Sequence, residues 1–349
     1  ASWTAKIFLD HGFSVRGTTR MLDSAKQVQD VLRDYVDAGR LSIIEVKDIT
    51  ADDAFDQAIQ GCYAVIHVAS PISQYFTDPD PVIHTAKTAT ISILASAVKY
   101  AQTNPSSSLT SVVLTSSTAA IMSPKDGPHT FTEDDWNTHS PAQVAEHGKN
   151  TPGIQIYRAS KVASERAFWD FRREHQEQIT FTMTTINPTW VIGPPLVPPT
   201  SPDKINETVL SIYTVLSGQP IPAPLAGSSA SFVDVRDVGR MHMLAVQRAK
   251  VADGQRYIAC AGLGAEQAIA DILNREYVGT DGSRSVWFKE KGRTMETGTP
   301  GKGYKPDYTW PNPAGVTIDG SKAVRDLGLE YIGYEKAVLD SARAFERYL

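Results

Sequence analysis

Tyr157 and Lys161 are the two side chains of this sequence whose types and spacing best suit chemistry. A separation of four residues places them on one face of a helix, one turn apart. A phenol normally loses its proton near pH 10, and a fixed cation close to it lowers that pKa. The pair therefore suits proton transfer at a substrate oxygen. A surface tyrosine lying over a lysine is the alternative, since the chain has 13 tyrosines.

A hydroxyl group at a strand end strengthens this interpretation. Ser117, with Ser116 as second choice, stands at the carboxyl end of the predicted strand SVVLTS, where it can donate a hydrogen bond to a substrate oxygen near the phenol. Serines are also common turn and capping residues at such positions. A later strand ends in Asn187-Pro188. The chain thus has three features in a fixed order: a serine at a strand end, a helix with Tyr-x-x-x-Lys, and a strand that ends in Asn-Pro. This order is much harder to obtain by chance than any one of the features alone.

Alternating strand and helix patterns position these residues. The predicted strands are 13–19, 41–46, 63–68, 111–116 and 181–186, and the predicted helices are 23–38, 52–60, 80–103 and 154–176. The strand at 63–68 is almost continuously apolar, as is typical of a parallel strand covered on both faces. We therefore predict an α/β fold of the Rossmann type, with a doubly wound parallel sheet. Ligands bind such sheets at the carboxyl ends of the strands.

The second half of the chain is less regular. It begins with a stretch rich in proline and glycine at 187–202, and it predicts strands at 231–235 and 255–260 with helices near 203–217, 237–250 and 334–348. We expect a dinucleotide-binding domain over residues 1–187 and a smaller, mainly substrate-binding region over 188–349. The strands near 231–235 and 255–260 are expected to return partly to the first domain.

The composition excludes several classes of function. The 34 basic and 39 acidic residues give a net charge of −5, which offers no basic surface for nucleic acid and no attraction to anionic membranes. No apolar stretch approaches the length that spans a bilayer. Cys62 and Cys260 are interpreted as buried thiols in a reducing compartment, so we expect a cytoplasmic protein. The acidic run at 133–135 has no histidine partners at metal-ligand spacing, and no metal is expected.

Eight segments together indicate a family. They are VRGTTR (15–20), HVASP (67–71), VVLTSS (112–117), FTEDDWN (131–137), YRASK (157–161), INPTWVIGPP (186–195), FVDVRDVGRMH (232–242) and SKAVRDLGL (321–329). The sequence resembles an extended short-chain dehydrogenase/reductase of the NAD-dependent epimerase/dehydratase superfamily. It is most similar to the carbonyl-reductase branch, which includes methylglyoxal and aldehyde reductases, dihydroflavonol and cinnamoyl-CoA reductases and fungal ketoreductases.

The resemblance implies direct hydride transfer from a reduced nicotinamide to a small aldehyde or ketone. Ser117 and Tyr157 would hold the carbonyl oxygen, and Tyr157 would protonate the forming alkoxide. Lys161 would lower the pKa of the phenol and bind the nicotinamide ribose. A monomer or a homodimer is expected. A nucleotide-sugar epimerase or dehydratase, and a non-catalytic dinucleotide-sensing regulator, are the alternatives on the same frame.

The region after the first predicted strand favours NADPH over NADH. An NAD site carries an acidic residue about twenty positions after its glycines, whereas this chain has Arg20 there and no carboxylate before Asp23. Arg20, helped by Lys26, would pair with a 2′-phosphate. The resemblance implies further cofactor contacts. Asp48 and Ile49 would border the adenine, and Val68, Ala69 and Ser70 would line the cofactor on the way to the nicotinamide. Pro188 and Thr189 would meet the nicotinamide end.

The start of the chain carries one more expectation. Members of the family begin with a strand and a Thr-Gly-x-x-Gly-x-x-Gly/Ala turn, and Ala1 matches the last position of that turn. We therefore expect the first strand and its glycines, about a dozen residues, to be missing before Ala1. Ala1 is included among the cofactor-binding residues for the same reason. The chain as written is expected to be unstable and to hold cofactor poorly.

Overall fold

A parallel four-stranded sheet lies at the centre of the protein. The computed structural model describes residues 1–73, 75–104, 108–220, 231–264, 266–278, 283–292, 295 and 315–349. The sheet has the order β3 (Ala64–His67), β4 (Ser111–Thr115), β6 (Thr182–Pro188) and β9 (Arg256–Ala259). Leu114 of β4 pairs with His67 on one side and with Thr185 on the other. The predicted α/β class with parallel strands is thus confirmed.

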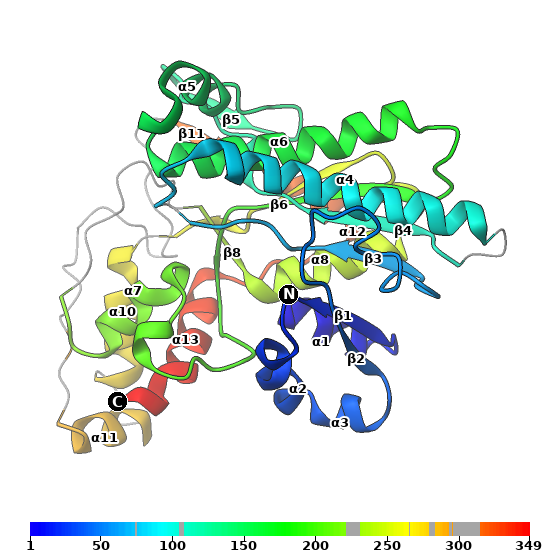
Figure 1. Cartoon of the computed structure of the whole chain (residues 1–349). Coiled ribbons are helices and arrows are strands. Elements are labelled where there is room, and N and C mark those ends of the chain that lie inside the picture. The colour runs from blue at the N-terminus through cyan, green and yellow to red at the C-terminus, as the bar shows by residue number, and fades with distance from the viewer. Residues whose placement is uncertain are drawn as a thin grey trace.

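Helices cover both faces of this sheet (Figure 1). α4 (Pro79–Thr103) and α6 (Gly153–Glu174) pack side by side on one face, while α8 (Val235–Gln247) and α12 (Ser321–Leu327) lie on the other. Successive side chains of a strand point to opposite faces. Accordingly Val112 and Leu114 belong to the core cluster under α4 and α6, and Val113 belongs to the cluster against α8.

The amino-terminal part forms a second, smaller unit below the central sheet (Figure 1). It comprises α1 (Ser2–Asp10), β1 (Val15–Thr19), α2 (Lys26–Val31), α3 (Arg33–Asp37) and β2 (Leu41–Glu45), with a 3₁₀ turn at Leu22–Ala25. α1 packs against α8. β1 and β2 pair in parallel with each other, and among the described residues neither pairs with the central sheet. The first strand that we expect before Ala1 stays a prediction.

Two of the predicted helices were wrong in part. The stretch 23–38 is divided into a 3₁₀ turn and the short helices α2 and α3, because Leu32, at the join, leaves helical geometry with ψ of 31°. The stretch 52–60 forms successive turns instead of a helix. Asp53 has a φ of 57°, which breaks a right-handed helix at its start. Phe55 and Ile59 are still buried, so the spacing of these apolar residues indicates that both pack into the core, although they are not in a helix.

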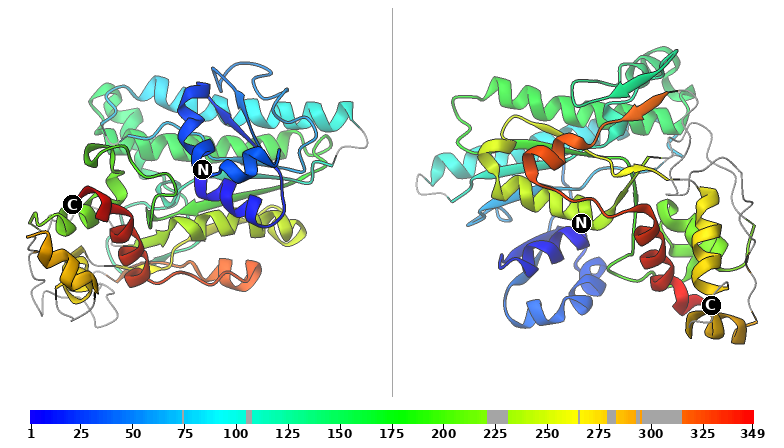
Figure 2. Two further views of the ribbon diagram at one scale, coloured as in Figure 1. Left: turned by 90° about the horizontal axis from the view of Figure 1, so that it is seen from below. Right: turned by 180° about the vertical axis from the view of Figure 1, so that it is seen from behind.

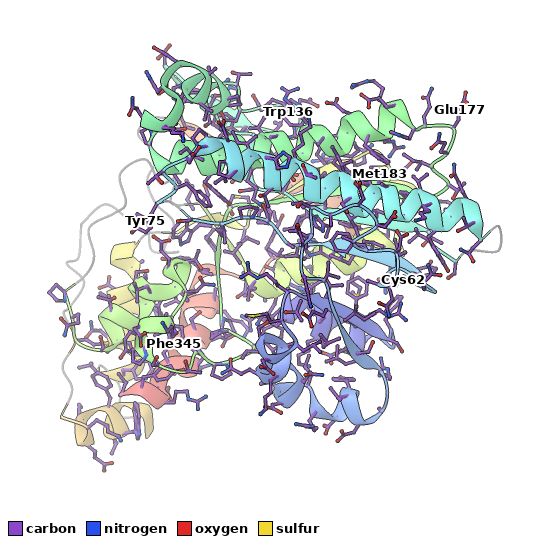
Figure 3. The ribbon with its side chains drawn as sticks, in the orientation of Figure 1. Cys62, Tyr75, Trp136, Glu177, Met183 and Phe345 are labelled. Atoms are coloured by element: carbon purple, nitrogen blue, oxygen red, sulfur yellow. The ribbon has the colours of Figure 1, made fainter. Side chains whose placement is uncertain are left out.

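A cluster of helices forms the carboxyl-terminal part, seen from behind in Figure 2. α7 (Glu207–Leu216), α10 (Glu266–Tyr277) and α13 (Tyr334–Phe345) share one apolar core, and α11 (Ser283–Glu290) packs against α10. Phe345, labelled in Figure 3, is fully buried in that core. Beside the helices lies the mixed sheet β10 (Gly262–Leu263), β8 (Ser231–Asp234) and β7 (Trp190–Ile192).

The remaining elements are short. β5 (His129–Phe131) pairs in parallel with β11 (Val316–Ile318), and α5 (His139–His147) packs against α6. The others are α9 (Ala249–Ala252) and the 3₁₀ helices η2 (Thr118–Ala120), η3 (Gly148–Asn150), η4 (Pro202–Lys204) and η5 (Glu346–Tyr348). Within the part of the chain that the structure describes, no helix combines the length and apolar character needed to cross a membrane.

Local signals explain where the main helices begin. Asp78 precedes α4, and its carboxylate accepts a hydrogen bond from the backbone N–H of Asp80, while Pro79 takes the first helical position. Asp234 caps α8 in the same way through the N–H of Arg236. Gly193 follows β7 with a φ of 108°, and a Cβ there would lie 2.8 Å from Oδ2 of Asp234. Glycine is therefore required where this strand meets the buried cap of α8.

Candidate active site

Ser117 and Tyr157 meet at the carboxyl end of the central sheet. Ser117 lies two residues after β4 and immediately before η2, while Tyr157 lies in the second turn of α6. The Ser117 hydroxyl lies close enough to the Tyr157 phenol to influence its ionisation, and both residues are half-buried. Lys161 follows Tyr157 by one helical turn and is only 7% exposed. The structure thus brings the hydroxyl and the phenol into contact, with the ammonium one turn further along α6.

The backbone around Ser117 holds its hydroxyl in place. The Oγ atom accepts a hydrogen bond of 3.1 Å from the N–H of Ala119, which makes Ser117 the cap of η2, and donates to the carbonyl of Pro188 at 3.4 Å. The capping role and the contact with Tyr157 are therefore both present. The hydroxyl of Ser116 donates instead to Oε2 of Glu165 at 2.5 Å in the interior. This geometry favours Ser117 over Ser116 as the residue that faces a substrate.

Burial dominates the electrostatics of the pair. It raises the pKa of the Tyr157 phenol above its usual value, because the interior solvates a phenolate poorly, and the hydrogen bond with Ser117 and the charge of Arg158 oppose this only in part. The net pKa of the phenol is thus raised, and the lowering by Lys161 that its spacing predicts stays a prediction. Burial lowers the pKa of Lys161 itself to about 8, and the Glu165 carboxylate opposes that fall. A protonated phenol suits a proton donor.

Two buried polar atoms near this end of the sheet have no hydrogen-bond partner among the described residues. They are Nε2 of His67, which ends β3, and Oγ of Ser70, three residues further along. Lys161 likewise has no hydrogen bond or ion pair within the described part of the chain. Burial, together with the charge of Lys161, lowers the pKa of His67 to about 4, so this ring is neutral at pH 7. Unpaired donors and acceptors of this kind fit a hydroxyl-rich ligand such as a ribose.

The other predicted cofactor residues fall into two groups. Arg20, directly after β1, and Lys26, at the start of α2, are exposed. Asp48 is also exposed and accepts hydrogen bonds from the N–H and hydroxyl of Thr50, which lower its pKa. Ile49 packs partly buried against the core under α4. These four lie in or next to the β1–β2 unit, apart from the Ser117–Tyr157 contact.

The second group surrounds the central sheet. Val68 is half-buried and Ala69 exposed in the extended segment after β3. Pro188, at the end of β6, accepts hydrogen bonds from Ser117 and Thr118 through its carbonyl. Thr189 is buried, and its hydroxyl donates to the carbonyl of Ala259 at 3.0 Å, so this side chain is already bonded. Ala1 is an exposed residue at the start of α1.

Sequence reasoning missed a buried polar cluster behind the catalytic candidates. Its centre is Glu165 of α6, which is fully buried and pairs with Arg256 of β9. Its position four residues after Lys161 was a signal, because that spacing places the two side chains on one helical face. Nothing in the sequence pointed to Arg256, whose partner is far away along the chain.

The acidic run at 133–135 has a structural role in this cluster. Oε1 of Glu133 accepts a hydrogen bond from the N–H of Ile258, and the carbonyls of Glu133 and Asp135 accept from Arg256. Trp136, labelled in Figure 3, lies under the guanidinium of Arg256 at 3.9 Å from the ring centre. The segment therefore holds the Arg256 side chain at the start of β9.

A model of the NAD dependent epimerase/dehydratase family matches residues 1–260. The chain belongs to this family. The extended short-chain dehydrogenase/reductase resemblance found in the sequence is confirmed. Because the match begins at residue 1, it leaves the expected upstream strand a prediction.

Within the NAD dependent epimerase/dehydratase family the chain is similar to named reductases. It is 34% identical over 280 residues to ketoreductase azaE of Aspergillus niger, covering 76% of this chain and 75% of that protein. It is 29% identical to the NADPH-dependent methylglyoxal reductase GRE2 of Saccharomyces cerevisiae, covering 96% and 92%. The crystal structure of yeast Gre2 complexed with NADPH superimposes with a TM-score of 0.78 at 25% identity, covering 100% of this chain and 96% of that one.

Proposed function

We propose that this protein reduces an aldehyde or ketone to an alcohol with NADPH. The observation that carries the proposal is the proximity of the Ser117 hydroxyl and the Tyr157 phenol, with the buried and unpaired Lys161 one helical turn further on, at the carboxyl end of a parallel sheet. The NADPH-dependent methylglyoxal reductase and the ketoreductase among the relatives support it.

When bound, a reduced nicotinamide would supply a hydride to the carbonyl carbon. The hydroxyl of Ser117 and the phenol of Tyr157 donate hydrogen bonds to the carbonyl oxygen, and Tyr157 passes its proton to that oxygen as negative charge develops on it. The raised pKa of Tyr157 keeps the proton on the phenol until then. The positive charge of Lys161 stabilises the phenolate that remains.

The chain's own residues fit a dinucleotide. Lys161 and the unpaired atoms of His67 and Ser70 are suited to ribose hydroxyls. We assign Val68, Ala69, Pro188 and Thr189 to the nicotinamide side, and Asp48, Ile49 and Ala1 to the remainder of the cofactor. Arg20 and Lys26 are exposed cations that suit a 2′-phosphate, which favours NADPH over NADH. Residues 1–187 would then bind the dinucleotide, and residues 188–349 would mainly bind the substrate.

An assay with both cofactors tests this function. NADPH and NADH are offered with aldehydes, diketones, keto esters and flavanonols, and nucleotide sugars are included to detect an epimerase or dehydratase. We expect oxidation of NADPH with at least one carbonyl compound and a higher kcat/KM than with NADH. Tight binding of NADPH without oxidation by any carbonyl would favour a dinucleotide-sensing regulator. Turnover of a nucleotide sugar without net NADPH loss would replace the reductase by an epimerase or dehydratase.

A further inference from the structure

Glu165 is the most densely bonded carboxylate in the interior near the proposed site. Its Oε2 atom accepts from the hydroxyl of Ser116 at 2.5 Å and from Nδ2 of Asn187 at 2.7 Å. Its Oε1 atom accepts from Nε of Arg256 at 2.6 Å and from the hydroxyl of Thr185 at 3.2 Å. The residue is fully buried. One side chain of α6 thus joins the helix to β6, to β9 and to the carboxyl end of β4.

These bonds reach Ser117 by two short routes. Ser116, which donates to Glu165, is the neighbour of Ser117 in the chain. Nδ2 of Asn187 donates to Glu165 and also, at 3.3 Å, to the backbone carbonyl of Ser117. The carboxylate therefore holds both the residue before Ser117 and the peptide group of Ser117 itself. Moving this strand end would move the hydroxyl away from Tyr157.

Glu165 also acts on Lys161, one helical turn earlier. Two titratable groups interact with the Lys161 ammonium, His67 of β3 and Glu165 of α6. Tyr157 lies one helical turn earlier on α6, and Arg256 of β9 is the ion-pair partner of Glu165. His67 is neutral at pH 7, because burial lowers its pKa to about 4. Glu165 is the group that favours the charged form of Lys161, and Arg256 forms an ion pair with the same carboxylate.

A purely structural role is the alternative explanation. A buried ion pair is weak support for stability, because taking two charges out of water offsets most of their attraction. An apolar pair of similar volume would often serve the fold as well. What such a pair would not provide is a negative charge next to Lys161, so the two explanations predict different effects of charge.

We propose that Glu165 is a positioning residue for the reduction: its carboxylate ties the Ser117 strand end to α6 and supplies a negative charge one turn from the Lys161 ammonium. This inference rests on the proposed reductase function. In the absence of the carboxylate, the ammonium of Lys161 loses the negative charge that favours its charged form, so it loses its proton at a lower pH. The positive charge of Arg256 also loses its buried partner. The hydroxyl of Ser117 also loses its support through Ser116 and Asn187.

Two variants with opposite charge changes test the proposal. In the wild-type protein the rate of reduction should fall above about pH 8, where Lys161 loses its proton. Glu165→Gln should move this alkaline limb to lower pH and reduce kcat at pH 7 by about tenfold or more, with recovery as the pH is lowered. Arg256→Gln breaks the same ion pair but leaves the carboxylate, so its limb should move to higher pH. The KM for the carbonyl should change little in either variant.

Thr185→Val serves as the uncharged control. It removes one hydrogen bond to Oε1 of Glu165 and keeps both charges, so the limb should stay at its wild-type pH. Circular dichroism and thermal unfolding confirm that each variant is folded. A limb that moves in the same direction in both charge variants, or that does not move in Glu165→Gln, would overturn the proposal. If the charge variants do not fold, Ser116→Ala takes their place: a kcat equal to that of the wild type would then overturn it.

A second readout separates this inference from the reductase proposal. The pKa of Lys161 can be measured by NMR in protein with isotope-labelled lysine, with Lys161→Met used for the assignment. Glu165→Gln should lower that pKa and Arg256→Gln should raise it, whether or not a carbonyl substrate is found. An inactive protein with these shifts would contradict the reductase function alone. An active protein without them would contradict the role of Glu165 alone.

Discussion

The Ser117 hydroxyl lies beside the Tyr157 phenol, although Ser117 follows strand β4 and Tyr157 lies on helix α6, later in the chain. The serine is held by the N–H of Ala119 and the carbonyl of Pro188, so its direction is determined by backbone atoms of η2 and of the end of β6. The tyrosine is held by α6, which packs along α4. A donor pair fixed in this way is prepared to receive a carbonyl oxygen.

Replacing Tyr157 by Phe should abolish reduction and leave cofactor binding unchanged. The phenol supplies the proton, and general acids of this kind contribute about a hundredfold or more to the rate. Steady-state kinetics and the fluorescence change on NADPH binding measure the two effects. Tyr63→Phe, in a residue 47% exposed, is the control. Activity within a few-fold of the wild type in Tyr157→Phe would remove the assigned acid.

Replacing Arg20 by Ala should weaken the preference for NADPH. The exposed guanidinium would lose its charge-assisted hydrogen bonds with the 2′-phosphate, so the KM for NADPH should rise by about tenfold or more. The KM for NADH should change little, because NADH lacks this phosphate. Arg33→Ala controls for the loss of a surface charge, since Arg33 is paired with Asp30. An equal rise for both cofactors would contradict the preference.

Replacing Lys161 by Met should stabilise the fold while it abolishes activity. The pKa of Lys161 is about 8 in the folded state and 10.5 in its ordinary state, so the folded protein binds fewer protons between these values. Its stability therefore rises with pH across that window, and the cost of burying the charge is fully present below about pH 8. We expect a gain of about 3 kcal/mol at pH 7 in the variant.

Denaturant unfolding of the Lys161→Met variant at several pH values measures this gain. The variant should also lose the rise in stability between about pH 8 and 10.5 that the wild type shows. Lys47→Met, in a side chain 85% exposed, should match the wild type. A variant less stable than the wild type at pH 7 would show that the buried ammonium does not destabilise the folded protein.

Acid should destabilise the protein through two buried histidines. His67 and His242 have a pKa of about 4 in the folded state against an ordinary value of 6.5, chiefly because of burial. Between these values the unfolded chain binds protons that the folded chain does not, so stability is lost as the pH falls from 6.5 toward 4. The loss should reach about 3 kcal/mol for each ring.

His242→Gln tests the acid effect. The glutamine can still bond with the hydroxyl of Thr115, which lies 2.7 Å from Nε2 of His242, and it does not titrate. The unfolding free energy of this variant should fall less steeply with acid than that of the wild type. His147→Gln, in a side chain 40% exposed, is the control and should not alter the slope. Identical slopes in His242→Gln and the wild type would refute the explanation.

Patterns that depend on neighbours in the chain were readable from the sequence. The spacing of Tyr157 and Lys161 determined that they share a helical face, since helix geometry relates residues four apart wherever the helix lies. The apolar runs of β3 and β4 likewise determined a parallel sheet covered on both faces. Local spacing was misleading at 52–60, where Phe55 and Ile59 lie in turns and are nevertheless buried. Apolar residues four positions apart can be buried with or without a helix, so their spacing does not identify one.

Only the tertiary structure decided which groups meet across the sheet. It directs the hydroxyl of Ser116 to Glu165 and leaves that of Ser117 beside Tyr157. The sequence alone does not show which of these two adjacent serines faces the tyrosine. It pairs Glu165 with Arg256, and it raises the pKa of the phenol that a lysine four residues away was expected to lower. The physical reason is that burial and long-range contact depend on how strands pack. Burial and long-range contacts determine how well a group is solvated and which charges lie near it, and local spacing in the sequence carries no information about either.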